Sequence, residues 1–528
     1  MTVTLADGGH LQLQKKALVT TDIQPKRDAT LDQKGGKNGD QIHSDEEEED
    51  CTSSTVMQHD LLLNYGMGMG HPEVAAWVRE HVAAQHRPPA RDWDTCMTVG
   101  STDAIYKVLT LLLEKGDILL TDEFTYSNAL EVCGTLGLRA RGVPLDRRGL
   151  EPGALRAACR ALRPKALYTV PTGQNPTGLS MDEDRTIEIY AVAQEFDLII
   201  IEDDAYYYLQ YPPYEENTDG QTVPRAPSAM PGLGGGGGGG GPLGRSFLSL
   251  DTDGRVVRLD TTSKALCPGL RLGWVAGPRA FVRKYRYFNE STCVMASGLS
   301  QSVFLATVRQ WGADGLDAHL RAVQAYFCRQ RDLAVAAARR HLVQPGLAKV
   351  VPPVAGMFLW IQASSNKKDD DIARSTQALT RLLIEAKILM VPGAHFYPPP
   401  STMRATKNSA SSDEVHGQAT CERQYLPTDT TQTCLRATFA TAGPDALDAA
   451  FARLAGVLSE HCNNEGCVGG TSSGHQNNRD EAVVEVDSEV NHFSKKKKMN
   501  EGGVVGTPVG GTEEALASAR LVGEAPVS

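Results

Sequence analysis

Polar side chains able to act as nucleophile, acid, base or anion ligand stand directly after several short apolar segments of this chain. They are Ser101 and Thr102, Asn175, Asp203 and Lys264, with Arg271 seven residues beyond the lysine. Alone, each has an ordinary explanation: a helix cap, a turn or a solvated charge. Together they supply an amine nucleophile, a carboxylate, an amide and an anion cradle. This set suits a phosphorylated cofactor with a cationic ring, held as a Schiff base.

The apolar segments that precede these residues read as strands and alternate with segments of helical spacing. The expected strands are Cys96–Val99, Ile118–Thr121, Ala166–Val170, Leu198–Ile201, Val256–Leu259 and Leu272–Val275, and the expected helices are Ala104–Leu113, Ala154–Leu162 and Glu183–Phe196. This alternation predicts βαβ units and a mostly parallel sheet buried on both faces. Ligands of such sheets bind beyond the carboxyl ends of the strands, so the polar side chains should meet at one rim.

The same patterns divide the chain into parts. We expect a large α/β domain over residues 61–285 and a smaller α+β domain over 286–460, helical from Arg286 to Leu342 and with strands at Val350–Gln362 and Ile388–Val391. Polar, glycine-rich or charge-rich composition predicts disorder in part of residues 1–60, including Asp45–Asp50, in a Gly-rich insertion at about 214–245, and in the tail 461–528. Residues 401–433 read as a loop insertion.

Composition excludes several classes of protein. The 528 residues are 41% hydrophobic and 22% charged, with no apolar run long enough to span a membrane and no signal peptide, which predicts a cytoplasmic protein without a membrane partner. The net charge of -11 disfavours nucleic acid as a partner. The 11 cysteines include no CxxC pair, so neither a disulfide scaffold nor a metal site is expected. The run Lys495–Lys498 reads as a solvated tail, with a nuclear localisation signal as the alternative.

Taken together and in this order, the motifs resemble the class I/II aminotransferases of the fold-type I pyridoxal-phosphate enzymes, within the branch of aromatic amino acid, kynurenine and 2-aminoadipate aminotransferases. The resemblance covers about residues 61–460 and rests on Leu63–Gly66, Gly100–Ser101, Gln174–Gly178, Glu202–Gln210, Ser263–Lys264, Pro268–Gly273, Gly356–Trp360, Val391–Gly393 and Leu435–Arg436. It implies a large domain with a mostly parallel, seven-stranded sheet and a smaller α+β domain.

The resemblance also implies roles around the cofactor, pyridoxal 5'-phosphate. Lys264 would bind it as a Schiff base and move a proton during catalysis, and Asp203 would pair with the protonated pyridine nitrogen. Asn175 and Tyr206 would hydrogen-bond the phenolic oxygen, and Tyr126 would stack on the ring.

Further roles concern the phosphate and the substrate. The phosphate ligands implied are Ser101, Thr102, Thr261, Ser263 and Arg271, where Thr261 replaces a more usual serine. Tyr65 would reach the phosphate from the partner subunit of a homodimer. Arg436, with Asn175, would bind the substrate α-carboxylate through a two-pronged contact.

The resulting prediction is a ping-pong aminotransferase that acts on a small amino acid and a 2-oxo acid such as 2-oxoglutarate. The family's N-terminal segment, which covers the active site, has no recognisable counterpart before Tyr65. Three alternatives therefore stay open: a lyase of the same fold, a non-catalytic regulator that binds the cofactor, and a degraded enzyme. The absence of a helix-turn-helix pattern in the acidic first 60 residues disfavours the regulator, and the intact lysine, aspartate and arginine positions disfavour the degraded enzyme.

Overall fold

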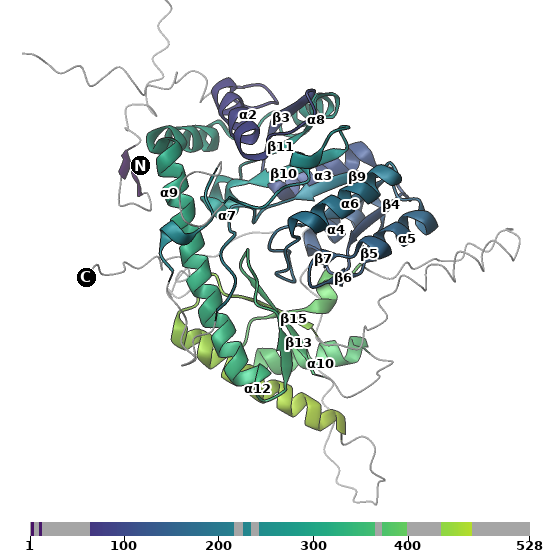
Figure 1. Ribbon diagram of the computed structural model, residues 1–528, viewed down its shortest axis with the longest axis vertical. Helices are drawn as coiled ribbons and strands as arrows, with labels where there is room; N and C mark the ends of the chain where they lie inside the picture. The colour runs from purple at the N-terminus through teal and green to yellow at the C-terminus, as the bar shows by residue number, and fades with distance from the viewer. Residues whose placement is uncertain are drawn as a thin grey trace, which may run out of the picture. The chain divides into compact units, whose positions relative to one another are not determined.

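A seven-stranded sheet lies at the centre of the larger part of the fold (Figure 1). The computed structural model describes residues 2–4, 10–12, 64–215, 225–233, 242–364, 372–398 and 434–466. In sheet order the strands are β3 (Trp93–Thr98), β11 (Gly273–Pro278), β10 (Val256–Thr261), β9 (Ile199–Asp203), β8 (Ala166–Thr169), β4 (Ile118–Asp122) and β5 (Arg139–Val143). Only β11 pairs antiparallel with its neighbours, which confirms the mostly parallel, seven-stranded sheet.

Alternating apolar residues of these strands bury two separate cores. Ile201 and Val257 pack with α3 (Ser101–Leu112), α4 (Ser127–Leu136) and α8 (Arg279–Thr292). Their neighbours Ile200 and Val256 pack with α2 (Pro72–His86), α5 (Pro152–Leu162) and α6 (Glu183–Glu195). Successive strand side chains point to opposite faces, so continuous apolar runs are needed where helices cover both. The sequence missed β5, because Arg139, Arg141 and Gly142 interrupt its apolar pattern.

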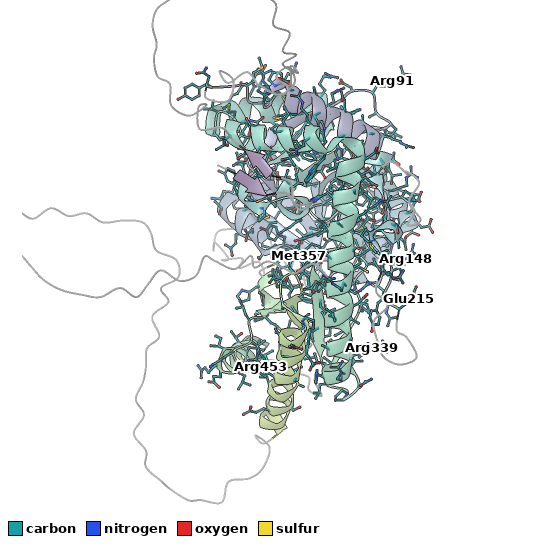
Figure 2. The ribbon with its side chains drawn as sticks, turned by 90° about the vertical axis from the view of Figure 1, so that its left-hand side faces the viewer. Arg91, Arg148, Glu215, Arg339, Met357 and Arg453 are labelled. Atoms are coloured by element: carbon teal, nitrogen blue, oxygen red, sulfur yellow. The ribbon has the colours of Figure 1, made fainter. Side chains whose placement is uncertain are left out.

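A second, antiparallel sheet has the order β12-β13-β15-β14. Its strands are Ala348–Val350, Phe358–Ala363, Cys434–Thr438 and Val391–Pro392 in that order, and α10 (Ile372–Glu385) and α12 (Pro444–Gly466) accompany them. The predicted strand Val350–Gln362 is therefore wrong as a single element: Pro352 and Pro353 separate β12 from β13. The helical stretch predicted from Arg286 to Leu342 is also interrupted, between α8 and α9 (Gly298–Ala338). In Figure 2 the label Arg339 stands at the end of α9.

The remaining helices, strands and turns of the described residues are short. They are β1 (Thr2–Thr4), β2 (His10–Gln12), β6 (Leu145–Asp146), β7 (Gly149–Leu150), α7 (Thr262–Ala265), the 3-10 turns η2 (Pro227–Ala229), η4 (Leu248–Leu250), η5 (Pro268–Leu270) and η7 (Gly393–Phe396), and the π-helical turn η6 (Arg339–Val343). None of the helices described here is both long and apolar enough to cross a membrane.

The predicted disordered stretches have mixed outcomes. The prediction for about 214–245 is too broad, because Met230 and Leu243 on either side of the glycine run are buried. Asp45–Asp50, Gly234–Gly241, residues 401–433 and residues 467–528, with Lys495–Lys498, lie outside the described residues. The tail prediction began at 461, whereas α12 continues to Gly466. The predicted domain boundaries stay predictions.

Candidate active site

Lys264 lies on the one-turn helix α7, which follows β10 directly. Its ammonium nitrogen is 5.9 Å from the ring centroid of Tyr206. Burial, followed by the nearby positive charges of Arg271 and Arg436, lowers the pKa of Lys264, while Asp203 acts in the opposite sense. A lysine with a lowered pKa is neutral for a larger fraction of the time, and the neutral amine is the nucleophile and base.

Asp203 ends β9, the strand beside β10, and its Cα pairs in register with that of Leu259. The Tyr168 hydroxyl donates a 2.6 Å hydrogen bond to Oδ2, whereas the buried Oδ1 has no partner among the described residues. Burial raises the pKa of Asp203 to about 6, and the hydrogen bond from Tyr168 opposes that rise. The site therefore holds a carboxylate with one oxygen anchored and one left for a further donor. The sequence analysis did not identify Tyr168.

An anion cradle forms where the start of α3 meets Arg271. Gly100 precedes the helix with a φ of 84°, and a Cβ built there would lie 2.4 Å from Nη2 of Arg271. The guanidinium donates to Ser263 Oγ at 3.2 Å, and Thr261 Oγ1 donates to the same oxygen at 2.9 Å. Arg271 forms no ion pair with a carboxylate in the described part of the chain. Free N–H groups of a helix start, hydroxyls and an arginine together favour a phosphate. Ser101 and Thr102, the first residues of α3, stand on this helix start.

Arg436 comes from β15 of the second sheet, a strand that the sequence did not predict. Its Nη1 donates to Asn175 Oδ1 at 2.9 Å, across 261 residues of sequence. The guanidinium carbon lies 4.4 Å from the ring centroid of Phe358 and 4.8 Å from that of Phe396. These aromatic faces hold the arginine without neutralising it, which leaves N–H groups for a carboxylate ligand.

The loop that carries Asn175 is fixed by Asp122 and Gln174, neither of which the sequence analysis assigned a role. Asp122, at the end of β4, accepts hydrogen bonds from Thr169 Oγ1 at 2.8 Å and from Gln174 Nε2 at 3.2 Å. Gln174 Oε1 in turn accepts from the backbone N–H of Thr177 at 2.9 Å. The signal available in the sequence was an acidic residue at a strand end, which alone is typical of many structural sites.

Most of these residues lie within a region that matches a known protein family. The family described as aminotransferase class I and II matches residues 46–419. The chain belongs to this family. It is 32% identical to the mouse mitochondrial kynurenine/alpha-aminoadipate aminotransferase, over 77% of this chain and 86% of that one. It is also 39% identical to aminotransferase swnA of Metarhizium robertsii, although that match covers only 57% of each chain.

Solved structures of aminotransferases have the same fold. Aminotransferase Aro8 from Candida albicans superposes with a TM-score of 0.65 at 30% identity, covering 76% of this chain and 79% of that one. The kynurenine aminotransferase of Pyrococcus horikoshii, solved in complex with PMP, superposes with a TM-score of 0.60 at 25% identity, covering 76% and 84%. The predicted fold class is thereby confirmed, and the family implies pyridoxal phosphate as cofactor.

The residues of this aminotransferase fit that cofactor. A buried carboxylate oxygen without a partner costs free energy, and a protonated pyridine nitrogen would supply the donor that Asp203 Oδ1 lacks among the described residues. The cradle at Gly100 and Arg271 would suit the phosphate, and Lys264 on α7, after the neighbouring strand β10, would supply the amine.

Two tyrosines remain to be placed. Tyr126 is the residue before α4. Burial raises the pKa of the Tyr206 phenol, and Tyr126 is close enough to Tyr206 to raise that pKa further. Tyr65 is 89% exposed and lies outside this cluster within its own chain. The structure therefore brings residues of both sheets together, and it leaves Tyr65 outside the site. The residues brought together are Lys264, Asp203, Asn175, Tyr206, Arg271 and Arg436.

Proposed function

We propose that this protein is a pyridoxal-phosphate-dependent aminotransferase that transfers the amino group of an aromatic amino acid, kynurenine or 2-aminoadipate to a 2-oxo acid such as 2-oxoglutarate. The observation that carries the proposal is the proximity of Lys264, on α7 directly after β10, to Asp203 at the end of the adjacent strand β9, a carboxylate with one buried oxygen that has no partner among the described residues. Arg436, held by Asn175, supports an α-amino acid as substrate. Relatives of the chain carry the names of these donor classes.

Each residue has a defined task in this mechanism. When bound, the cofactor supplies an electron sink that stabilises the charge left when the substrate Cα loses a proton. The neutral amine of Lys264 would accept that proton at Nζ and would later release it to the reacting carbon of the bound group. The ionised Asp203 would keep the ring nitrogen protonated, and Arg271, Ser263 and the start of α3 would hold the phosphate. Arg436 orients the substrate through its carboxylate.

A ping-pong reaction follows from one site serving both substrates in turn. The amino donor leaves as a 2-oxo acid before the acceptor enters, so Arg436 must bind the carboxylate of both. Its setting between Phe358 and Phe396 suits this use, because the guanidinium forms no ion pair with a carboxylate among the described residues.

The test is a panel of amino donors with 2-oxoglutarate, scored by kcat/KM, together with the visible absorbance of the bound cofactor. We expect activity with at least one aromatic donor, and loss of both activity and the lysine-linked absorbance in Lys264→Ala. Turnover of the amino acid without any 2-oxo acid would favour a lyase of the same fold. Cofactor binding without single-turnover conversion of any donor would favour a non-catalytic regulator or a degraded enzyme.

A homodimer is part of the proposal. Tyr65 and Met67 expose 89% and 57% of their surface, and Leu299 at the start of α9 exposes 58%. The backbone N–H of Gly66 donates to the sulfur of Met295, which lies in the segment between α8 and α9, so the chain next to Tyr65 is held close to the segment that precedes Leu299. Exposed apolar surface of this kind supports association, and it would let Tyr65 reach the phosphate of the partner subunit. Full activity of a monomer at micromolar concentration would contradict this role.

The cellular location is proposed as cytoplasmic from the composition. The mouse relative is named as mitochondrial. Fractionation of the native cells, with the protein followed by antibody, distinguishes the two.

A further inference from the structure

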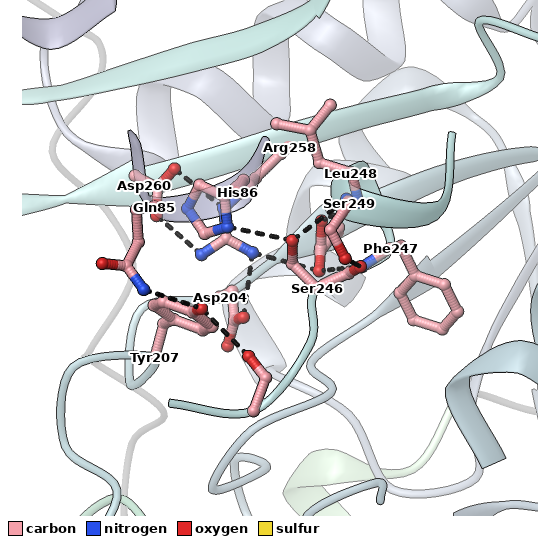
Figure 3. Close-up of polar contacts among 12 residues, drawn as sticks. Gln85, His86, Asp204, Tyr207, Ser246, Phe247, Leu248, Ser249, Arg258 and Asp260 are labelled. Atoms are coloured by element: carbon pink, nitrogen blue, oxygen red, sulfur yellow. Dashed lines mark hydrogen bonds and ion pairs between the residues drawn. The ribbon is translucent and has the colours of Figure 1, made fainter. Parts of the chain in front are cut away.

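One arginine and three carboxylates form a fully buried cluster between β9 and β10 (Figure 3). The Arg258 side chain is 0% exposed, and its Nη1 lies 3.0 Å from both Glu202 Oε1 and Asp204 Oδ2. The Nε and Nη2 atoms each donate at 2.9 Å to Asp260, one to each carboxylate oxygen. One guanidinium therefore binds groups from two neighbouring strands at once.

The cluster is also tied to the chain around it. Glu202 accepts hydrogen bonds from the backbone N–H groups of Phe247 at 2.8 Å and Leu248 at 3.2 Å. The guanidinium carbon lies 4.7 Å from the ring centroid of Tyr207. Burial, followed by the charge of Arg258, lowers the pKa of His81 to about 4 and lowers that of His86 too, so neither histidine adds a positive charge at neutral pH. Arg258 is the cation that these three carboxylates share.

The cluster adjoins the candidate active site both in the sequence and in the sheet. Glu202 and Asp204 are the residues on either side of Asp203, and Asp260 is followed closely by Lys264. In the sheet register Arg258 pairs with Glu202 and Leu259 pairs with Asp203. Since side chains alternate along strands, the cluster occupies one face while Asp203 is free to face the other. Fixing the cluster thus fixes the end of β9, which carries Asp203, and the end of β10, which leads directly into α7 with Lys264.

We propose that Arg258 is a positioning residue for the cofactor: by clamping Glu202 and Asp204 to Asp260, it holds the spacing between Asp203 and Lys264 that a single ring must match. This inference rests on the proposed function. A lysine cannot replace the arginine, because its single ammonium cannot donate in fixed directions to carboxylates on both strands.

The experiment compares Arg258→Lys with a matched control, Arg331→Lys. Arg331 is also 0% exposed, donates to the carbonyl oxygens of Pro353 and Pro212, and lies 5.0 Å from the ring centroid of Tyr211. Both variants replace a fully buried arginine that stacks on a tyrosine, but only Arg258 joins β9 to β10. The measurements are the melting temperature without cofactor, and the dissociation constant and absorbance spectrum with pyridoxal phosphate.

We expect Arg258→Lys to weaken cofactor binding at least tenfold and to shift the absorbance of the bound cofactor, since that absorbance depends on the charge of the ring nitrogen near Asp203. Arg331→Lys should lower the melting temperature by a similar amount and leave affinity within twofold and the spectrum unchanged. If Arg258→Lys does not fold, Asp260→Asn is tested instead, because it removes one of the two carboxylate oxygens of Asp260 that accept from Arg258. This variant should weaken cofactor binding about threefold.

Three results would count against the inference. The first is normal cofactor affinity and a normal spectrum in folded Arg258→Lys. The second is a loss of cofactor affinity in Arg331→Lys equal to that in Arg258→Lys. The third, where Arg258→Lys does not fold, is normal cofactor affinity in Asp260→Asn. A wild-type protein that binds no pyridoxal phosphate would instead refute the proposed function itself.

Discussion

Replacing Tyr168 by phenylalanine removes one hydroxyl and tests the role of Asp203. Tyr168 is fully buried and donates the 2.6 Å hydrogen bond that stabilises the ionised form of Asp203, whose pKa is about 6. A hydrogen bond to a charged group contributes about 1.5–3 kcal/mol, which corresponds to roughly one to two pKa units. The variant should therefore raise the pKa of Asp203 to roughly 7–8, and its ionised fraction at pH 7 should fall from about 90% to roughly 10–50%.

The charged groups that face Asp203 come from several elements. Asp204 and Asp260 raise its pKa and Arg258 lowers it, and all three are unchanged in Tyr168→Phe. The neutral acid cannot stabilise a protonated ring, so cofactor affinity should fall with the ionised fraction. Because the pKa is raised, the loss should be largest at and below neutral pH and should diminish as pH rises above the new value.

The assay titrates apo-protein with pyridoxal phosphate between pH 6 and pH 9. We expect Tyr168→Phe to bind up to about tenfold more weakly at pH 7 and to approach the wild type at pH 9. Tyr190→Phe serves as the control, because Tyr190 is a buried phenol that donates to Asp251 at 3.1 Å and to Asp253 rather than to Asp203. A loss that is the same at every pH, or that Tyr190→Phe shares, would refute the electrostatic explanation.

Three further predictions concern the cradle, the substrate and stability. Gly100→Ala should weaken cofactor binding at least tenfold, because the new Cβ would meet the guanidinium of Arg271 at 2.4 Å; Gly116→Ala, also at positive φ but with open space, should leave binding unchanged in the same titration. Arg436→Lys should raise KM for amino donors about a hundredfold in steady-state assays and leave cofactor affinity within twofold; a changed cofactor affinity would contradict a substrate role. Burial raises the pKa of both Asp122 and Asp203 to about 6, so the folded apo-protein binds more protons than the unfolded chain between about pH 4 and 6. The free energy of unfolding, measured by urea titration, should therefore fall as pH rises through that window. A free energy of unfolding that rises instead would show that other groups dominate.

The sequence by itself determined most of the central sheet and indicated the candidate reacting groups. Apolar runs separated by helical spacing require strands buried on both faces, and a parallel sheet brings the residues that follow its strands to one rim. Lys264 and Asp203 could therefore be expected at that rim from their places after Leu259 and Ile201, and the family resemblance implied the roles proposed for them. The apolar pattern did not predict β5, because two arginines and a glycine interrupt it. Only the pairing of β5 with β4 identifies this segment as a strand.

The tertiary structure alone decided how those groups are supported and charged. The bond from Arg436 to Asn175 joins residues 261 apart in the chain, and the bond from Tyr168 to Asp203 joins two neighbouring strands. Such contacts depend on register and packing between elements, which no local pattern encodes. The same holds for the pKa of Asp203 and for the Arg258 cluster, because burial and the distances to other charges arise only when the strands are side by side.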